Sequence, residues 1–258
     1  MRSNALILLA IASLAAVPLQ EAKAAIDLKT AGTYAVLAGT TVTNTGATTL
    51  NGDLGLNSGT SITGTGTVTF TAGTIHATDT ASGIAKDDLT AAYIVAAGLA
   101  PTQTMTVPQL GGLTLTPGVY YLAGQGLLTG TLTLDAQNNP NAEFVFQIGS
   151  ELIAASGSSV VTIAGGSTPA GSNVFWQVGS SATLNTTTAF QGHILALTSV
   201  DVKTGATIIN GSAMARIGAV TLQGNTITHS VVPEPATMTL ALFGGALSLM
   251  KRSRRVAR

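Results

Sequence analysis

Cysteine is absent from this chain of 258 residues, so neither disulfides nor thiolate metal sites can form. Charged residues make up only 9% and aromatic residues only 4%. The chain therefore offers few groups for acid–base catalysis and few rings for a sugar-binding platform. By contrast, 40 residues are Thr, 30 are Gly and 45% are hydrophobic. Hydroxyl and methyl groups must therefore cover much of the surface of a chain that can bury a sizeable core.

The formal net charge of zero hides an uneven distribution of charge along the chain. Residues 1–24 have the form of a secretory signal, with an early basic residue, an apolar run and a small-x-small cleavage site. Residues 231–258 contain Pro-Glu-Pro, then 15 largely apolar residues, then five basic residues. Between these ends, four basic residues oppose nine acidic ones, for a net charge of −5. That balance argues against nucleic acid as a partner, because binding phosphates requires a basic surface.

The C-terminal segment resembles the PEP-CTERM sorting signals of Gram-negative bacteria. The resemblance implies export, transient retention by a short transmembrane helix, and processing by an exosortase-type enzyme. A simple C-terminal membrane anchor is the alternative, although 15 residues are few for a membrane span. We therefore expect residues 25–230 to form a domain that is secreted or held at the outer cell surface.

One sequence pattern recurs through the second half of the chain. FVFQIGSELIAASGSSV (144–160) lines up with VFWQVGSSATLNTTTAF (174–190), which places Gln147 on Gln177. Further copies follow in residues 183–196, 201–215 and 219–227. Short β-branched runs that repeat about every 20 residues, separated by Gly, Asn or Ser, predict a β-helix whose coils stack around a common core.

The first half of the chain completes this prediction. Residues 26–55 read as one more coil, and residues 56–75, with little to bury, suit an irregular cap over an open end. Residues 79–99 have apolar residues at helical spacing, with Thr78 or Asp79 as the N-cap. We expect this single long helix to lie along one face of the β-helix.

These stretches together resemble the β-solenoid ice-binding (antifreeze) proteins of cold-adapted microbes. The matching segments include YAVLAGTTVTNTGATTLNGDLGLNSGTSITG, LTGTLTLDAQNNPNAEFVFQIGS and TGATIINGSAMARIGAVTLQGNTI. The resemblance implies an all-β-dominated fold: a right-handed parallel β-helix, roughly triangular in section, with one long α-helix alongside. It also implies adsorption to an ice crystal through ordered water on a flat Thr/Ser-rich face, with thermal hysteresis and inhibition of ice recrystallisation. We expect a monomer without cofactors.

The candidate ice-binding residues form an uncharged column. In the family, Thr-(Ala or Gly)-x-(Thr or Asn) lies on the ice-facing side, and Thr45–Thr48 and Thr204–Thr207 fit that motif. Stacked strands lie about 4.7–4.9 Å apart and Thr is stiff at its first side-chain torsion, so such a column holds its hydroxyls and methyls in fixed positions. We expect the ice-contacting residues to be Thr45, Thr48, Ser156, Ser159, Thr186, Thr188, Thr204, Thr207 and Thr226.

A neighbouring column is the weaker candidate because charges interrupt it. It contains Thr131, Thr133, Thr162, Thr183 and Thr221, together with Asp201 and Lys203. Charged groups keep their own hydration shells and would disturb an ice-like water layer. Any single Thr in either column is also an ordinary strand-forming residue, so the absence of charge is what favours the first column.

Catalytic and metal-binding patterns are not found. The repeats carry few ionisable residues, chiefly Asp201, Lys203 and Arg216, and adjacent Asp87 and Asp88 point different ways on a helix. His76, His193 and His229 are too far apart in sequence for zinc-ligand spacing. We expect no enzyme and no metal site. The alternative function is a cell-surface or biofilm-matrix adhesion protein on the same scaffold.

Overall fold

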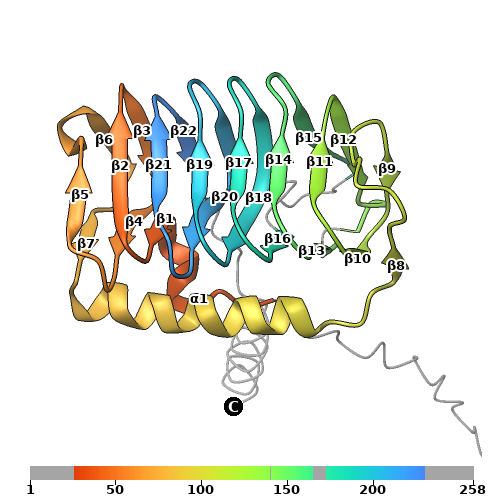
Figure 1. The fold of residues 1–258 in the computed structure, drawn as a ribbon, viewed down its shortest axis with the longest axis horizontal. Helices are drawn as coiled ribbons and strands as arrows, with labels where there is room; N and C mark the ends of the chain where they lie inside the picture. The colour runs from red at the N-terminus through yellow and green to blue at the C-terminus, as the bar shows by residue number, and fades with distance from the viewer. Residues whose placement is uncertain (1–25, 140, 165–172, 230–258) are drawn as a thin grey trace, which may run out of the picture.

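The protein is a parallel β-helix with three faces and one long helix, in a computed structural model that describes residues 26–139, 141–164 and 173–229 (Figure 1). Neighbouring coils pair in parallel on every face. The predicted fold class is confirmed: stacked coils enclose one apolar core, and the helix packs alongside. We name the three faces the helix face, the mixed face and the threonine face.

The helix face begins and ends with short strands. Its strands are β8 (Gln103–Thr104), β10 (Gly118–Leu122), β13 (Phe144–Ile148), β16 (Val174–Val178), the second parts of β18 (Ala189–Ala196) and β20 (Thr207–Ala215), β1 (Tyr34–Ala38), β4 (Asp53–Leu56) and β7 (Ile75–Ala77). A 3-10 turn, η1 (Lys29–Thr33), leads into β1.

The mixed face is a seven-stranded sheet. Its strands are β11 (Gly126–Leu128), β14 (Leu152–Ala154), β17 (Ala182–Leu184), β19 (Val200–Val202), β21 (Val220–Gln223), β2 (Thr41–Thr45) and β5 (Ser61–Thr63). The threonine face comprises β9 (Thr114–Leu115), β12 (Thr131–Asp135), β15 (Ser159–Ile163), the first parts of β18 and β20, β22 (Thr226–Thr228), β3 (Thr48–Asn51) and β6 (Val68–Ala72), with η2 (Thr65–Thr67) before β6.

The register of the coils matches the repeat seen in the sequence. Phe144 pairs with Val174, Gln147 with Gln177, and Thr183 with Asp201. Inward residues of successive coils stack, as in the ring pair of Phe146 and Trp176, whose centroids are 4.0 Å apart. Such aromatic stacking adds to the burial of apolar area that stabilises the coils.

Where β18 turns from the threonine face to the helix face, the chain requires glycine. Gly192 has a φ of +98°, and a Cβ there would lie 2.5 Å from the carbonyl oxygen of Val174. The pairing of β18 with β20 shifts register at this corner. The small residue and the bulge together let one strand serve two faces.

The spatial order of the coils differs from their order in sequence. Along the mixed face the strands run β11, β14, β17, β19, β21, β2, β5, so the N-terminal coil stacks on the C-terminal coil (Figure 1). Residues 56–75, predicted as an irregular cap, instead form a further coil with regular strands β5 and β6. Backbone pairing with β2 and β3 supplies the regularity that the apolar content does not.

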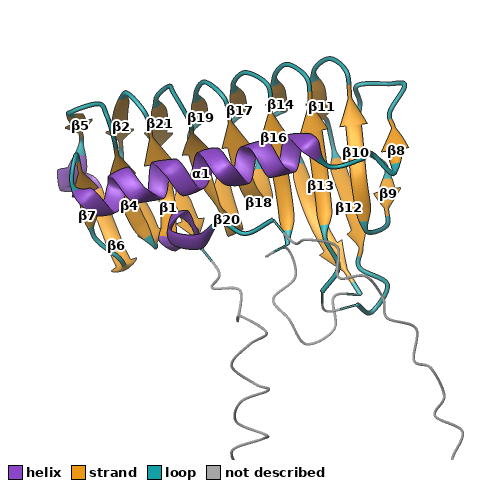
Figure 2. Ribbon diagram, turned by 90° about the horizontal axis from the view of Figure 1, so that it is seen from below, coloured by secondary structure: helices purple, strands orange, loops and turns teal. Residues whose placement is uncertain are grey.

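The helix α1 (Thr80–Gly98) lies along the helix face from β7, beside the end coil that contains β5 and β6, to β13 near the other end of the stack (Figure 2). Asp79 is the N-cap and accepts a hydrogen bond from the backbone N–H of Ser82 at 2.8 Å. The predicted apolar stripe is buried: Ala85, Leu89, Ala92, Tyr93 and Ala96.

Outward amides of the helix face hold this helix in place. Gln147 Nε2 donates to the carbonyl oxygens of Ala96 and Leu99, each at 2.8 Å, and so satisfies acceptors at the end of the helix. Gln177 Nε2 donates to the Tyr93 hydroxyl at 2.8 Å. The predicted signal (1–24) and tail (231–258) lie outside the described residues. Within the residues that the structure describes, no helix is long and apolar enough to span a membrane.

Candidate functional site

The threonine face carries a straight row of small outward side chains. Each row residue immediately precedes a large inward apolar residue, as Thr49 precedes Leu50 and Thr207 precedes Ile208. Strand pairing places the row members side by side on seven successive coils. In spatial order they are Thr131, Ser159, Ala189, Thr207, Thr226, Thr49 and Thr69. We call this set the threonine row.

The surroundings of the threonine row are almost free of charge. Two residues further along each strand, a second row contains Thr133, Val161, Gln191, Ile209, Thr228 and Asn51, of which Gln191 is buried. Neither row contains an ionisable residue, and Asp135 lies beyond them at the end of β12. The two rows form a grid with spacings of about 4.8 Å between strands and about 6.6 Å along each strand. Hydroxyls on this grid can bind water without the fixed hydration shell of an ion.

The predicted site residues fall into three groups. Ser159, Thr207 and Thr226 lie in the threonine row. Three others, Ser156, Thr186 and Thr204, lie on the exposed turns that lead from the mixed face to the threonine face, and Thr45 is exposed at the end of β2, where such a turn begins. The turns border the row, so seven of the nine predicted residues lie on or beside one surface.

Thr48 and Thr188 do not lie on this surface, and their predicted outward orientation is wrong. Their exposed fractions are 1% and 0%. Thr48 Oγ1 donates to Asn44 Oδ1 at 2.6 Å, while Thr188 Oγ1 donates to the carbonyl oxygen of Asn185 at 2.8 Å. Each hydroxyl satisfies a buried polar group of the turn and cannot contact a ligand on the face.

The motif alignment failed because the turns differ in length. After the left-handed residues Gly157, Thr187, Gly205 and Gly224, the row residue comes two positions later. After Gly46 it comes three positions later, at Thr49, and after Gly130 only one later, at Thr131. A shift of one residue reverses which side chains face outward. The large apolar residue after each row member is the sequence signal that locates Thr49, Thr69 and Thr131.

The second predicted column combines residues from two faces. Thr131 and Thr133 belong to the threonine face, whereas Thr183, Asp201 and Thr221 lie in a row on the mixed face. That row continues through Thr43 and Thr63 at one end and Ile153 and Leu127 at the other. Asp201 Oδ2 lies 3.1 Å from Lys203 Nζ, so an ion pair interrupts the mixed face near its centre. Thr162 is half-buried and donates to Gln191 Oε1 at 2.8 Å.

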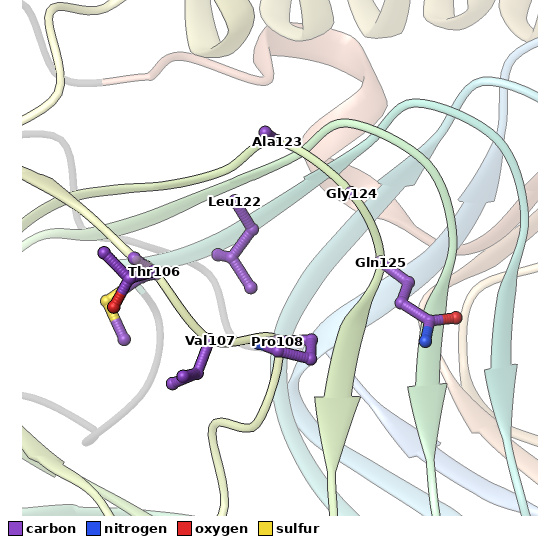
Figure 3. Close-up of a pocket in the computed structure, with 8 residues that line it drawn as sticks. Thr106, Val107, Pro108, Leu122, Ala123, Gly124 and Gln125 are labelled. Atoms are coloured by element: carbon purple, nitrogen blue, oxygen red, sulfur yellow. The ribbon is translucent and has the colours of Figure 1, made fainter.

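Apart from the three faces, the described residues include a pocket and two neighbouring histidines. A pocket of about 310 Å³ lies between Met105–Pro108 and Leu122–Gln125, and none of its eight lining residues is ionisable (Figure 3). Among the described residues no three His, Asp or Glu side chains could hold a metal ion. His193 and His229 do lie near each other, with ring centroids 6.1 Å apart, but His193 Nδ1 bonds Ser212 Oγ at 2.9 Å. Burial lowers the pKa of His229.

Several proteins similar to this chain in sequence or fold are named ice-binding proteins. The profile of the family described as ice-binding-like matches residues 36–228. An ice-binding protein of Nostoc sp. (strain HG1) is 46% identical over 89% of this chain and 88% of its own length. An ice-binding protein of Flavobacterium frigoris (strain PS1) is 31% identical over 79% of this chain and 76% of its own.

Solved structures give the same result. The crystal structure of an ice-binding protein from an Antarctic biological consortium is 44% identical and matches with a TM-score of 0.76, covering 83% of this chain and 96% of its own. That of the Antarctic ascomycete Antarctomyces psychrotrophicus is 36% identical, with a TM-score of 0.75 over 81% and 100% of the two chains. The likeness thus extends over nearly all the described coils, and this chain belongs to the ice-binding-like family.

Proposed function

We propose that this protein binds ice through the threonine face and thereby produces thermal hysteresis and inhibits ice recrystallisation. The observation that carries the proposal is the threonine row itself: seven small outward side chains on consecutive coils, with no ionisable residue among them. The ice-binding proteins similar to this chain support the activity.

The rigidity of the grid explains how weak contacts could sum to useful binding. The row residues sit on strands hydrogen-bonded on both sides over most of the stack, above a core of fully buried apolar residues. Their side chains have little rotamer freedom to lose, because Ala has none and β-branched Thr is stiff at its first side-chain torsion. Because neither the protein nor a water layer ordered over it must rearrange, little entropy opposes adsorption.

The mixed face is the less suitable surface for two reasons. Asp201 and Lys203 hold charges near its centre. At one end its row changes from Thr to the large apolar residues Ile153 and Leu127, so small side chains do not continue along the whole stack. We therefore assign ice contact to the threonine row and its second row, with Thr45 at the end of β2 and the turn residues Ser156, Thr186 and Thr204 at the border.

The proposed setting is outside the cell. The signal-like residues 1–24 and the sorting-like tail 231–258 favour export and processing by an exosortase-type enzyme. An exported ice-binding domain would act on ice in the surroundings of the cell, where it would work as a monomer.

Thermal hysteresis of the full-length chain tests the proposal, with one substitution placed on each face. Thr207→Tyr puts a bulky ring in the middle of the threonine row, and Thr183→Tyr puts the same ring on the mixed face. We expect Thr207→Tyr to abolish most of the hysteresis and Thr183→Tyr to leave it nearly intact. The reverse result would assign the activity to the mixed face. Absence of hysteresis in the folded parent would favour the adhesion function instead.

A further inference from the structure

A chain of buried polar side chains runs beneath one half of the threonine row. Its members are Asn225, Thr48 and Asn44, with exposed fractions of 2%, 1% and 5%. They come from the C-terminal coil and the N-terminal coil, which are adjacent in the stack but distant in sequence. We call these three residues the polar spine.

Asn225 joins the C-terminal coil to the coils on both sides. Its Nδ2 donates to the carbonyl oxygens of Lys203 at 2.8 Å and Ala206 at 2.9 Å, and its Oδ1 accepts from the Gln223 backbone N–H at 2.6 Å. On the other side, its backbone N–H donates to Thr48 Oγ1 at 3.1 Å. The amide thus uses both of its donors and its acceptor.

Thr48 and Asn44 extend the connection to the end coil. Thr48 Oγ1 donates to Asn44 Oδ1 at 2.6 Å. Asn44 Nδ2 in turn donates to the Gly64 carbonyl oxygen at 3.1 Å and to Thr67 Oγ1 at 3.0 Å. Through these bonds the polar spine connects four consecutive coils in one network whose buried groups are satisfied, and such networks rigidify a unique arrangement.

The hydrogen bond from the Asn225 backbone N–H to Thr48 Oγ1 joins two residues that each precede a member of the threonine row. Asn225 is followed by Thr226, and Thr48 by Thr49, and these two row residues pair with each other. The backbone N–H of Thr49 also donates to the carbonyl oxygen of Asn225 at 2.8 Å. Coils that follow one another in sequence are joined by the chain itself. The C-terminal coil and the N-terminal coil have no such connection, and we call the boundary between them the seam. The hydrogen bonds of the polar spine are therefore in position to fix the offset between Thr226 and Thr49.

The other half of the threonine row is built differently. Beneath Ala189, Thr188 Oγ1 reaches only the preceding coil, at the carbonyl oxygen of Ala155. Beneath Ser159, Ser158 Oγ has no hydrogen-bond partner. The bridging network is thus concentrated at the seam rather than distributed along the whole row.

We propose that the polar spine is a positioning element for ice binding: it contacts no ice, but holds Thr207, Thr226, Thr49 and Thr69 in one plane across the seam. The inference rests on the proposed function of the threonine face. It gives Thr48, which is buried, a role in the activity that differs from direct contact.

Two substitutions at Thr48 in the full-length chain separate positioning from packing. Thr48→Val keeps the shape of the side chain but removes the hydroxyl, whereas Thr48→Ser keeps the hydroxyl. We expect Thr48→Val to lower hysteresis by about two- to tenfold at equal concentrations of folded protein, because the variant loses both hydrogen bonds of the hydroxyl, to Asn44 Oδ1 and from the Asn225 N–H, and with them the fixed offset of the row. Thr48→Ser should retain most of the activity. Tyr93→Phe, which removes a buried hydroxyl on the helix face, is the control for destabilisation and should leave hysteresis unchanged.

The outcomes distinguish this inference from the proposed function. Full hysteresis in folded Thr48→Val would overturn the positioning role while leaving ice binding intact. An equal loss of hysteresis in Tyr93→Phe would overturn it too, since the effect would then follow stability alone. Absence of hysteresis in the parent would refute both. If Thr48→Val does not fold, Asn225→Asp takes its place, because it keeps the side-chain shape but removes the two hydrogen bonds that Nδ2 donates. Full hysteresis in folded Asn225→Asp would then overturn the positioning role.

Discussion

Thr226 and Thr49 lie side by side on β22 and β3, although they stand near opposite ends of the described chain. The same seam joins β1 to β20 and β2 to β21, so the N-terminal coil is enclosed between the C-terminal coil and the end coil. The threonine row is continuous only because this seam closes. Folding must therefore complete contacts between distant segments before the candidate ice-binding face exists.

A cavity at the seam should destabilise the whole protein. Leu50 is fully buried and lies between Ile227 and Phe70 in the inward stack. We expect Leu50→Ala to lower the free energy of unfolding by about 2–5 kcal/mol, from lost burial and the remaining cavity. Chemical denaturation followed by circular dichroism measures this change. A cost below about 0.5 kcal/mol, typical of surface sites, would show that the seam does not contribute to the folded core.

The helix N-cap should give stability a dependence on acidic pH. The backbone N–H of Ser82, and then the ring of His76, lower the pKa of Asp79 from 3.8 to about 2. Because the folded state favours the carboxylate, this stabilisation is complete above pH 4 and is lost as the pH falls toward 2. Melting temperatures of the parent and Asp79→Ala should differ by a few degrees at pH 7 and converge near pH 2. A constant gap, or a similar gap for the exposed Asp87→Ala on the same helix, would contradict the capping role.

Helix docking should matter for stability but not for ice binding. In Tyr93→Phe, Gln177 Nε2 loses the hydroxyl that accepts its hydrogen bond at 2.8 Å. Leaving that buried donor unsatisfied should cost about 1–3 kcal/mol. Replacing Gln177 with Leu in the same protein should recover part of the loss, because neither partner is then left unpaired. Thermal unfolding measures both variants; equal stability of Tyr93→Phe and the parent would show that this bond contributes nothing.

Removing the charges of the mixed face should change little. Asp201 and Lys203 form a partly exposed ion pair, and such pairs contribute about 0–1 kcal/mol. We expect the double variant Asp201→Thr and Lys203→Thr to keep the stability of the parent within that range and its hysteresis within about twofold, a change of about 0.4 kcal/mol. A large gain in hysteresis would mean that the mixed face also binds ice once its charges are removed.

Much of the fold could be predicted because the apolar periodicity is local. Gln147 and Gln177 align in sequence and pair in space, and the stripe from Ala85 to Ala96 identifies the helix. The seam between β22 and β3 could not be predicted, since similar coils have similar surfaces and no local pattern specifies which distant coil comes next. The regular end coil was missed for a related reason: backbone pairing, not buried apolar area, defines its strands.

The candidate site was predicted only in part, because outward orientation depends on single residues in the turns. Thr207 follows its left-handed Gly205 by two positions and faces outward, whereas Thr48 follows Gly46 by two positions and is buried. One additional turn residue produces the difference. The positions of the corners caused the second error, since Thr131 and Thr183 are alike in sequence but lie on different faces.

Direct adsorption to a growing ice crystal shows whether the threonine face binds ice. The fluorescently labelled full-length chain, Thr226→Tyr and Thr221→Tyr would each be present while a single ice crystal grows slowly, and the protein in the ice and in the liquid would be measured. We expect the parent and Thr221→Tyr, on the mixed face, to enter the ice, while Thr226→Tyr, in the threonine row, remains in the liquid. Incorporation of folded Thr226→Tyr at the level of the parent would contradict it.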